Sequence, residues 1–180
     1  MNVRKATMRD IPAMLSLINW YAGQEIMLPR TELELAESIR DFRVCEIGSK
    51  LVGCGALHFY TAASGEIRSL AVSPESKASG IGRKIVEALE QEARDADLSC
   101  LFAFTYVPGF FARLGYQEVD RNLIPLKAWK DCLCCSKFQN CDEIAVLKAL
   151  KSAPPEGPSP PTQDGEPALF PVLKTIGYIA

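Results

Sequence analysis

Apolar and polar residues follow one another in blocks that predict alternating strands and helices, and one strand–loop–helix unit is especially clear. Residues 67–72 form an apolar run of strand length, which Pro74 and the small polar residues after it bring to an end. From residue 81 onward, apolar side chains recur at the spacing of one helix face: Ile81, Ile85, Leu89 and Ala93. The pattern predicts a buried strand, a short loop and an amphipathic helix, with Gly80 and Gly82 where that helix begins.

The remaining chain up to residue 150 divides into further short elements. Strands are predicted over residues 3–7, 42–47, 51–60, 66–72, 99–106, 116–119 and 144–150. Helices are predicted over residues 11–22, from a capping box at Thr31 and Glu34 to about residue 41, from residue 80 to 96, and from Pro108 to Gly115. The strand–helix–strand crossover in this order predicts an α/β (α+β) fold, a mixed twisted sheet of about six to seven strands with helices on both faces.

Composition divides the chain into one domain and a tail. A length of 180 residues suits a single domain with a proper core. Residues 154–161 are rich in proline, which excludes the interior of a helix or strand. We predict a domain over residues 1–150 and a flexible, Pro-rich linker and C-terminal tail over residues 151–180. The apolar end of the tail, residues 168–179, leaves open whether it docks on the domain or a partner, or stays disordered.

Charge and cysteine content restrict the class of protein. The formal charge of −2 argues against non-specific binding of nucleic acid as the main role. No apolar run approaches the roughly 20 residues of a membrane span, and no apolar signal core follows the first five residues. These features predict a cytoplasmic protein with reduced thiols. Four cysteines gather in one segment: Cys132, Cys134, Cys135 and Cys141. Their spacing fits a zinc site poorly, so we expect no metal, with metal binding or a regulatory disulfide as alternatives.

The loop before the helix at residue 81 is suited to an anion. The first N–H groups of a helix lack partners within the helix, and its dipole favours negative charge there. Arg83 and Lys84 add positive charge. The segment has no Gly-Lys-Ser/Thr of a P-loop, and Ile85 stands where a dinucleotide fingerprint needs its third glycine. The loop can therefore hold a phosphate or pyrophosphate, although an ordinary strand-to-helix turn would use the same small residues.

The strand end Leu70-Ala71-Val72-Ser73-Pro74 is followed by a basic residue, two others and Gly-x-Gly. This pattern resembles the acetyl-CoA pyrophosphate loop of the GNAT acyltransferase superfamily, with Lys77 where that family carries Arg or Gln. The predicted order of elements is also that of the GNAT fold. The resemblance implies acetyl-CoA as co-substrate, bound by the strand end, the loop and an aromatic helix: Leu70, Ala71, Val72, Lys77, Ala78, Ser79, Gly80, Ile81, Gly82, Arg83, Phe110 and Phe111.

Residues 108–116 resemble the aromatic GNAT helix that packs beside the coenzyme thiol. Phe111 stands where many relatives have a tyrosine that protonates the leaving thiolate, which phenylalanine cannot do. Tyr106 is the nearest hydroxyl in the sequence. Glu66 matches the position of GNAT residues that act as base, directly or through water, and the reference pKa of His58 suits proton transfer. We predict catalytic roles for Glu66, Tyr106 and His58, although each residue type is equally at home in a structural role.

Three stretches, residues 27–42, 53–72 and 123–143, resemble the amino-acid N-acetyltransferases that make N-acetylglutamate. In that branch the arginine of a Leu-x-Arg loop contacts a substrate carboxylate, and Arg30 holds this position here. A guanidinium can grip a carboxylate through two hydrogen bonds. Arg68 and Lys127 are candidates for a second carboxylate.

The resemblance implies transfer of an acetyl group from acetyl-CoA to the α-amino group of L-glutamate, in arginine biosynthesis. The expected partners are these small molecules, with no nucleic acid, no membrane and a possible homodimer. Three alternatives stay open: an acetyltransferase for another amine, such as another amino acid, a protein N-terminus or a small amine; a non-catalytic acyl-CoA-binding regulatory module; and a cysteine-based metal or redox protein.

Overall fold

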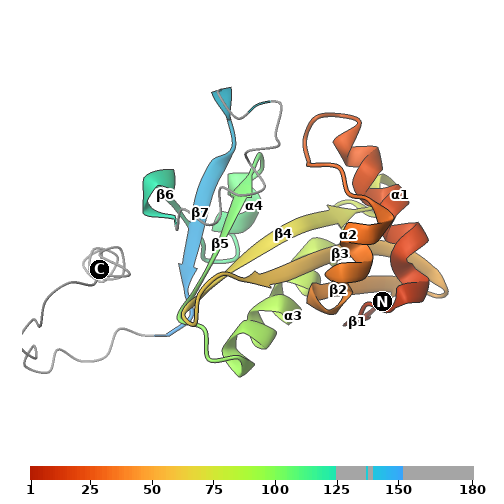
Figure 1. Ribbon diagram of the computed structural model, residues 1–180, viewed down its shortest axis with the longest axis horizontal. Coiled ribbons are helices and arrows are strands. Elements are labelled where there is room, and N and C mark those ends of the chain that lie inside the picture. Colours follow the sequence, from red (N-terminus) through yellow and green to blue (C-terminus); the bar gives the residue numbers. More distant parts are fainter. Residues whose placement is uncertain (125–136, 138–139, 152–180) are drawn as a thin grey trace, which may run out of the picture.

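A mixed sheet forms the centre of the molecule (Figure 1). The computed structural model describes residues 1–124, 137 and 140–151. Within this part of the chain seven strands lie in the order β1-β2-β3-β4-β5-β7-β6. Their bounds are Asn2–Lys5, Phe42–Ile47, Lys50–Phe59, Ser64–Val72, Cys100–Thr105, Gln117–Val119 and Ile144–Ala149 for β1 to β7. Only the β4–β5 pair is parallel among these strands. The predicted α/β fold with a mixed sheet is confirmed.

The helices cover both faces of the sheet, as the sequence predicts. Helices α1 and α2 (Ile11–Ala22 and Glu32–Glu37) lie on one face, and α3 (Ile81–Asp95) lies on the other, while α4 (Pro108–Ala112) is short and follows β5 (Figure 1). The predicted capping box forms, because the Thr31 hydroxyl accepts from the Glu34 N–H and the Glu34 carboxylate accepts from the Thr31 N–H. The helix predicted to reach residue 41 ends at Glu37, and a separate 3-10 turn spans Ile39–Asp41.

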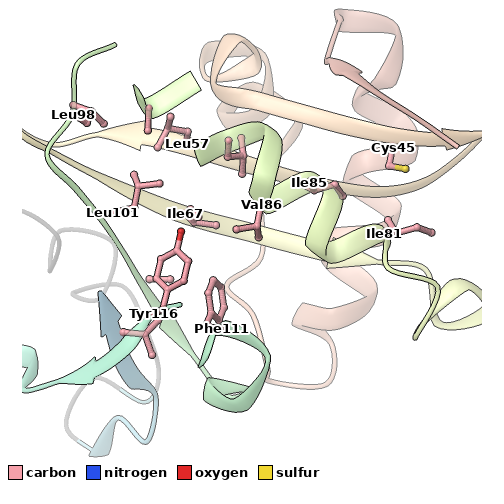
Figure 2. Close-up of a cluster of buried hydrophobic side chains, with 14 of the residues drawn as sticks. Cys45, Leu57, Ile67, Ile81, Ile85, Val86, Leu98, Leu101, Phe111 and Tyr116 are labelled. Carbon is pink, nitrogen blue, oxygen red and sulfur yellow. The ribbon is translucent and has the colours of Figure 1, made fainter. Parts of the chain in front are cut away.

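The predicted apolar face of α3 is the centre of the larger core. Ile81, Ile85, Leu89 and Ala93 are all at most 1% exposed and pack against strands β3, β4 and β5 (Figure 2). Helix α3 lies close to β3, since a Cβ added at Gly53 or Gly55 would come within 2.9 Å of the Ile85 side chain. The α1 side carries a second core cluster around Met14, Ile18 and Leu35. The sheet is therefore held between two apolar layers.

Strands β4 and β5 part after a short parallel contact. Within the described strands their pairing is confined to Ser64–Glu66 of β4 and Cys100–Phe102 of β5. Figure 1 shows β4 and β5 meeting at one end and diverging along the rest of their length. Strand β4 also carries a bulge, because its register against β3 shifts between Cys54 and Ala56, opposite Ser69, whose φ is +52°. The splay opens a gap in the sheet at its centre.

A buried ion pair ties α3 to the last strand. The Lys148 ammonium donates to both carboxylate oxygens of Glu90, each at 2.8 Å, and to the Leu114 carbonyl at 2.7 Å. The two side chains are 21% and 6% exposed. Arg94 also contacts Glu90, at 3.2 Å. This cluster connects α3, the end of the α4 segment and β7.

Lys148→Met is expected to lower the free energy of unfolding by about 3 kcal/mol, because it leaves the buried Glu90 carboxylate without its main partner. The matched control is Lys50→Met, since Lys50 pairs with Glu75 at a site where the two side chains are 68% and 74% exposed. That change should alter stability far less. Urea denaturation of both variants measures the difference, and equal stabilities would contradict the importance of burial here.

Candidate active site

A cavity of about 430 Å³ lies where β4 and β5 part. The second half of β4 and the end of β5 form two of its walls, and the connection between α1 and α2 forms a third. Side chains from other elements complete the lining: Tyr21, Lys77, Phe111 and Glu143. The cavity therefore depends on the splay of the two parallel strands, which is also the usual place for a ligand at the carboxyl ends of such strands.

Charged residues of both signs line this cavity. Arg30, Arg68 and Lys77 bring positive charge, and Glu66 and Glu143 bring negative charge. Burial raises the pKa of the Glu143 carboxyl, against the lowering effect of Arg121. Among the described lining residues, three cations face two carboxylates. The cavity is thus suited to a small anionic molecule that also carries a basic nitrogen.

Glu66 lies at the point where the strands separate, and it is 8% exposed. His58 is its direct neighbour across the β3–β4 pairing. The His58 Nδ1 lies 3.2 Å from Asp41 Oδ2, and its ring packs edge-on against Tyr60. Glu66 is therefore a lining group of the cavity, whereas His58 is a neighbour of Glu66 and is absent from the described lining.

The bulge in β4 decides which of its side chains face the cavity. Leu70 and Val72 line it, while Ala71 is buried in the core on the α1 side. The Val72 carbonyl accepts a hydrogen bond of 2.6 Å from the Tyr21 hydroxyl. Beyond Glu66 the edge of β4 that paired with β5 faces the cavity instead of a neighbouring strand. Backbone groups at this edge can bind an extended ligand in the way that a strand would.

The loop between β4 and α3 contains two residues in the left-handed conformation just before the N-terminus of the helix. Gly80 is the N-cap of the 15-residue helix α3 and has a φ of +79°, and Ala78 is also left-handed, at +65°. Lys84 N–H makes the first bond of the helix, to the Gly80 carbonyl, so the N–H groups before it precede the helical ladder. The Ser79 hydroxyl donates to the Ser76 carbonyl, and Arg83 pairs with Glu87 at 2.7 Å. Among the basic residues of this loop, Lys77 is the one that lines the cavity.

The structure gives a packing reason for glycine at position 82, which the sequence did not reveal. A Cβ at this position would lie 3.3 Å from the Phe110 ring. The missing side chain therefore makes room for Phe110, which in turn packs edge-on against Phe111 at 5.1 Å between centroids. Phe111 lines the cavity and packs against Tyr116 at 5.2 Å, as Figure 2 shows. These aromatic contacts connect the start of α3 with α4 and the cavity wall.

Tyr106 follows directly on β5 and lines the cavity. Its hydroxyl donates to Asp142 at 2.8 Å, and the Lys137 ammonium lies 3.5 Å from the hydroxyl oxygen. Burial, and then the hydrogen bond to Asp142, raise the pKa of Tyr106. The hydroxyl therefore stays protonated throughout the neutral range.

Some predicted residues lie outside the described part of the chain. Lys127 and three of the clustered cysteines, Cys132, Cys134 and Cys135, are among them. The described Cys141 has a free thiol that accepts from Arg121 at 3.5 Å. No group of three or more His, Cys, Asp or Glu side chains suited to a metal ion occurs among the described residues.

The sequence did not single out Tyr21 and Glu143 as site residues. Tyr21 lies on the apolar face of α1, where its spacing indicates only a core residue. Besides bonding Val72, its ring lies 5.2 Å from the Lys77 ammonium. Glu143 immediately precedes β7, and the pairing of β7 with β5 brings it beside the end of β5. That pairing joins residues about 40 positions apart, so no local sequence pattern indicates it.

Comparison with known proteins defines the class. The chain matches the model of the acetyltransferase (GNAT) family over residues 11–116. It therefore belongs to this family, and the protein is an acetyltransferase that uses acetyl-CoA as its acetyl donor. Within the described residues, none of the helices has both the length and the apolar character required to cross a membrane.

The relatives give the family membership more detail. The chain is 42% identical over 148 residues to an uncharacterized N-acetyltransferase of Chlorobaculum tepidum, a match that covers 82% of this chain and 96% of the relative. It is 42% identical over 152 residues to the amino-acid acetyltransferase of Mycobacterium tuberculosis, a match that covers 83% of this chain and 86% of the relative.

A solved structure is also similar to this one. N-acetylglutamate synthase from Neisseria gonorrhoeae, complexed with coenzyme A and N-acetyl-glutamate, aligns with a TM-score of 0.77 at 29% identity. The match covers 84% of this chain and 35% of the synthase, so this chain corresponds to about a third of that protein.

The prediction that residues 77–83 hold the coenzyme pyrophosphate can be tested at Gly80. Gly80→Ala is expected to weaken coenzyme A binding about fivefold, because a left-handed alanine costs roughly 1 kcal/mol. Gly80→Asn is the control, since asparagine adopts the left-handed conformation more readily and should weaken binding less. Titration calorimetry measures both affinities. Unchanged affinity in the alanine variant would show that the loop conformation is not needed for the coenzyme.

Proposed function

We propose that the protein transfers the acetyl group of acetyl-CoA to the α-amino group of L-glutamate, which makes it an N-acetylglutamate synthase of arginine biosynthesis. The observation that carries this proposal is the cavity at the β4–β5 splay, where Arg30, Arg68 and Glu66 line the same space. The named activities of the similar proteins from Mycobacterium tuberculosis and Neisseria gonorrhoeae support an amino acid as acceptor.

Glutamate suits the charges of the cavity. It carries two carboxylates and one ammonium, and the cavity offers two guanidinium groups in addition to the carboxylate of Glu66. In the proposal Arg30 binds one carboxylate and Arg68 the other, because planar guanidinium groups bind carboxylates through paired hydrogen bonds. Lys127 stays a predicted additional cation. A peptide N-terminus or a simple amine does not carry the two carboxylates beside one ammonium that suit this arrangement of charges.

Acetyl-CoA is proposed to enter from the other side of the splay. Its pyrophosphate binds the loop of residues 77–83, at the positive end of α3. Its acetyl-bearing arm lies along the exposed edge of β4 near Leu70 and Val72, with Phe111 beside the thiol. Backbone N–H groups of this edge can stabilise the oxyanion that forms on the acetyl carbonyl.

The substrate ammonium loses two protons in all, of which the leaving thiolate takes up one and the solvent receives the other. The substrate arrives as an ammonium, so Glu66 takes a proton from it, directly or through water, and frees the nitrogen lone pair. The nitrogen then forms a bond to the carbonyl carbon and gives up a second proton, while the bond from carbon to sulfur breaks. The leaving thiolate takes up a proton, for which the Tyr106 hydroxyl is the candidate among the hydroxyl groups of the lining. Because the raised pKa makes Tyr106 a weaker acid than free tyrosine, we expect its contribution to be small.

The choice of acceptor can be tested by the release of free thiol from acetyl-CoA with glutamate, glutamine, aspartate, lysine and a peptide N-terminus. Fast release is expected with glutamate. Arg30→Ala should raise the KM for glutamate about 100-fold, because a carboxylate loses its charged hydrogen-bonding partner. The KM for acetyl-CoA should stay the same. Arg9→Ala is the control, since Arg9 is an exposed arginine that is not part of the cavity lining. Faster release with the peptide or lysine would overturn glutamate as the substrate.

The roles of Glu66 and Tyr106 can be separated by their effects on kcat. Glu66→Gln is expected to lower kcat about 100-fold near neutral pH, since the base is lost while the shape is kept. Tyr106→Phe should lower kcat much less, for the reason given above. Initial rates at saturating acetyl-CoA measure both, with Glu75→Gln as an exposed carboxylate control. A larger loss in the Tyr106 variant than in the Glu66 variant would reverse the assignment.

A further inference from the structure

The backbone of Arg30 is held by a single side chain from a neighbouring helix. The Asn19 Nδ2 group donates to the Arg30 carbonyl at 2.9 Å, and the Asn19 Oδ1 accepts from the Arg30 N–H at 2.9 Å. Asn19 is half-buried in the last turns of α1. Its own backbone is part of the helix, since the Asn19 carbonyl accepts a hydrogen bond from the Gly23 N–H at 2.9 Å. One amide therefore satisfies both backbone groups of the same residue, 11 positions further along the chain.

The asparagine amide suits this pair of bonds because its donor and its acceptor are two separate atoms of one planar group. The N–H of Arg30 needs an acceptor and its carbonyl needs a donor, and the carboxamide of asparagine supplies one of each. The opposite orientation of the amide would set donor against donor and acceptor against acceptor, so the orientation is determined by the contacts. An aspartate would keep the acceptor, lose the donor and place a negative oxygen against the carbonyl.

The residues on either side of Arg30 explain why this support is needed. Pro29 has no N–H to donate, so it contributes less to anchoring the segment. Thr31 begins the capping box of α2 and has extended backbone angles. Arg30 thus lies between a proline and a helix cap, in the connection that crosses from α1 to α2 (Figure 1). The two bonds to Asn19 fix its backbone at the point from which its side chain lines the cavity.

We propose that Asn19 is a positioning residue for substrate recognition, which acts through Arg30 by fixing the backbone from which the guanidinium reaches the carboxylate. This inference rests on the proposed function, in which Arg30 binds a substrate carboxylate. Asn19 is not among the described residues that line the cavity, so its effect on the substrate passes through Arg30. Holding the guanidinium in place before the substrate arrives reduces the ordering cost of binding.

The test is a double-mutant cycle on the full chain, with KM and kcat measured by thiol release. Asn19→Ala should raise the KM for glutamate about tenfold, the size expected from losing two hydrogen bonds of about 1 kcal/mol each with partial compensation. The KM for acetyl-CoA should not change. Asn19→Asp, which keeps the shape, should also raise the KM for glutamate, because it lacks the donor. In the Arg30→Ala background neither change should raise it further.

The control is Gln24→Ala, which removes an exposed amide of the same region that donates to the Trp20 carbonyl at 3.0 Å. It should leave the KM for glutamate unchanged. Two outcomes would overturn the positioning role of Asn19 and leave the proposed function standing. The first is additive effects of Asn19→Ala and Arg30→Ala on the KM for glutamate. The second is a KM that rises with Arg30→Ala but with neither Asn19 variant. If Arg30→Ala itself leaves the KM for glutamate unchanged, the proposed function loses its carboxylate-binding residue, and the inference is overturned with it.

Discussion

The separation of β4 from β5 after Glu66 is the constraint on which the whole site depends. Parallel strands normally stay paired along their length, and here the described pairing covers only three residues of each strand. One apolar core, centred on α3, packs against both strands on one face of the sheet, and β5 pairs with β7 on its other side. The separation leaves an edge of β4 without a neighbouring strand and opens a cavity in the middle of the sheet. Every lining group discussed above lies around that opening.

Under the proposed function, both substrates meet at this separation. The start of α3 lies at the end of β4, so its unpaired N–H groups are at one end of the opening. The α1–α2 connection, with Arg30, lies at the other side. Gly82, Phe110 and Phe111 join the loop before α3 to the cavity wall through direct contacts. Changes in α4 are therefore expected to reach both ends of the site.

Two side chains of α1, Tyr21 and Asn19, hold other residues of the cavity lining in place. Tyr21 bonds the Val72 carbonyl and carries the Lys77 ammonium over its ring, so it supports the end of β4 and the loop at once. Asn19 supports Arg30 in a comparable way. Both supporting residues come from α1, which lies on the face of the sheet opposite α3. Helix α1 thus supports the cavity wall at Arg30 and Val72, although Tyr21 is its one residue in the described lining.

The sequence by itself determined the order of strands and helices, the amphipathic face of α3 and the glycine at its N-cap, because these follow from local periodicity and from backbone conformations that few residues tolerate. It also indicated Arg30, Glu66 and Tyr106 through family patterns. Only the tertiary structure decided that β7 lies between β5 and β6, and that His58 lies beside Glu66 but outside the described cavity lining. It alone revealed Tyr21, Glu143 and Asn19, whose contacts depend on how separate elements pack against one another. Local patterns cannot carry such information, since the contacts exist only once the sheet and its two covering layers have assembled.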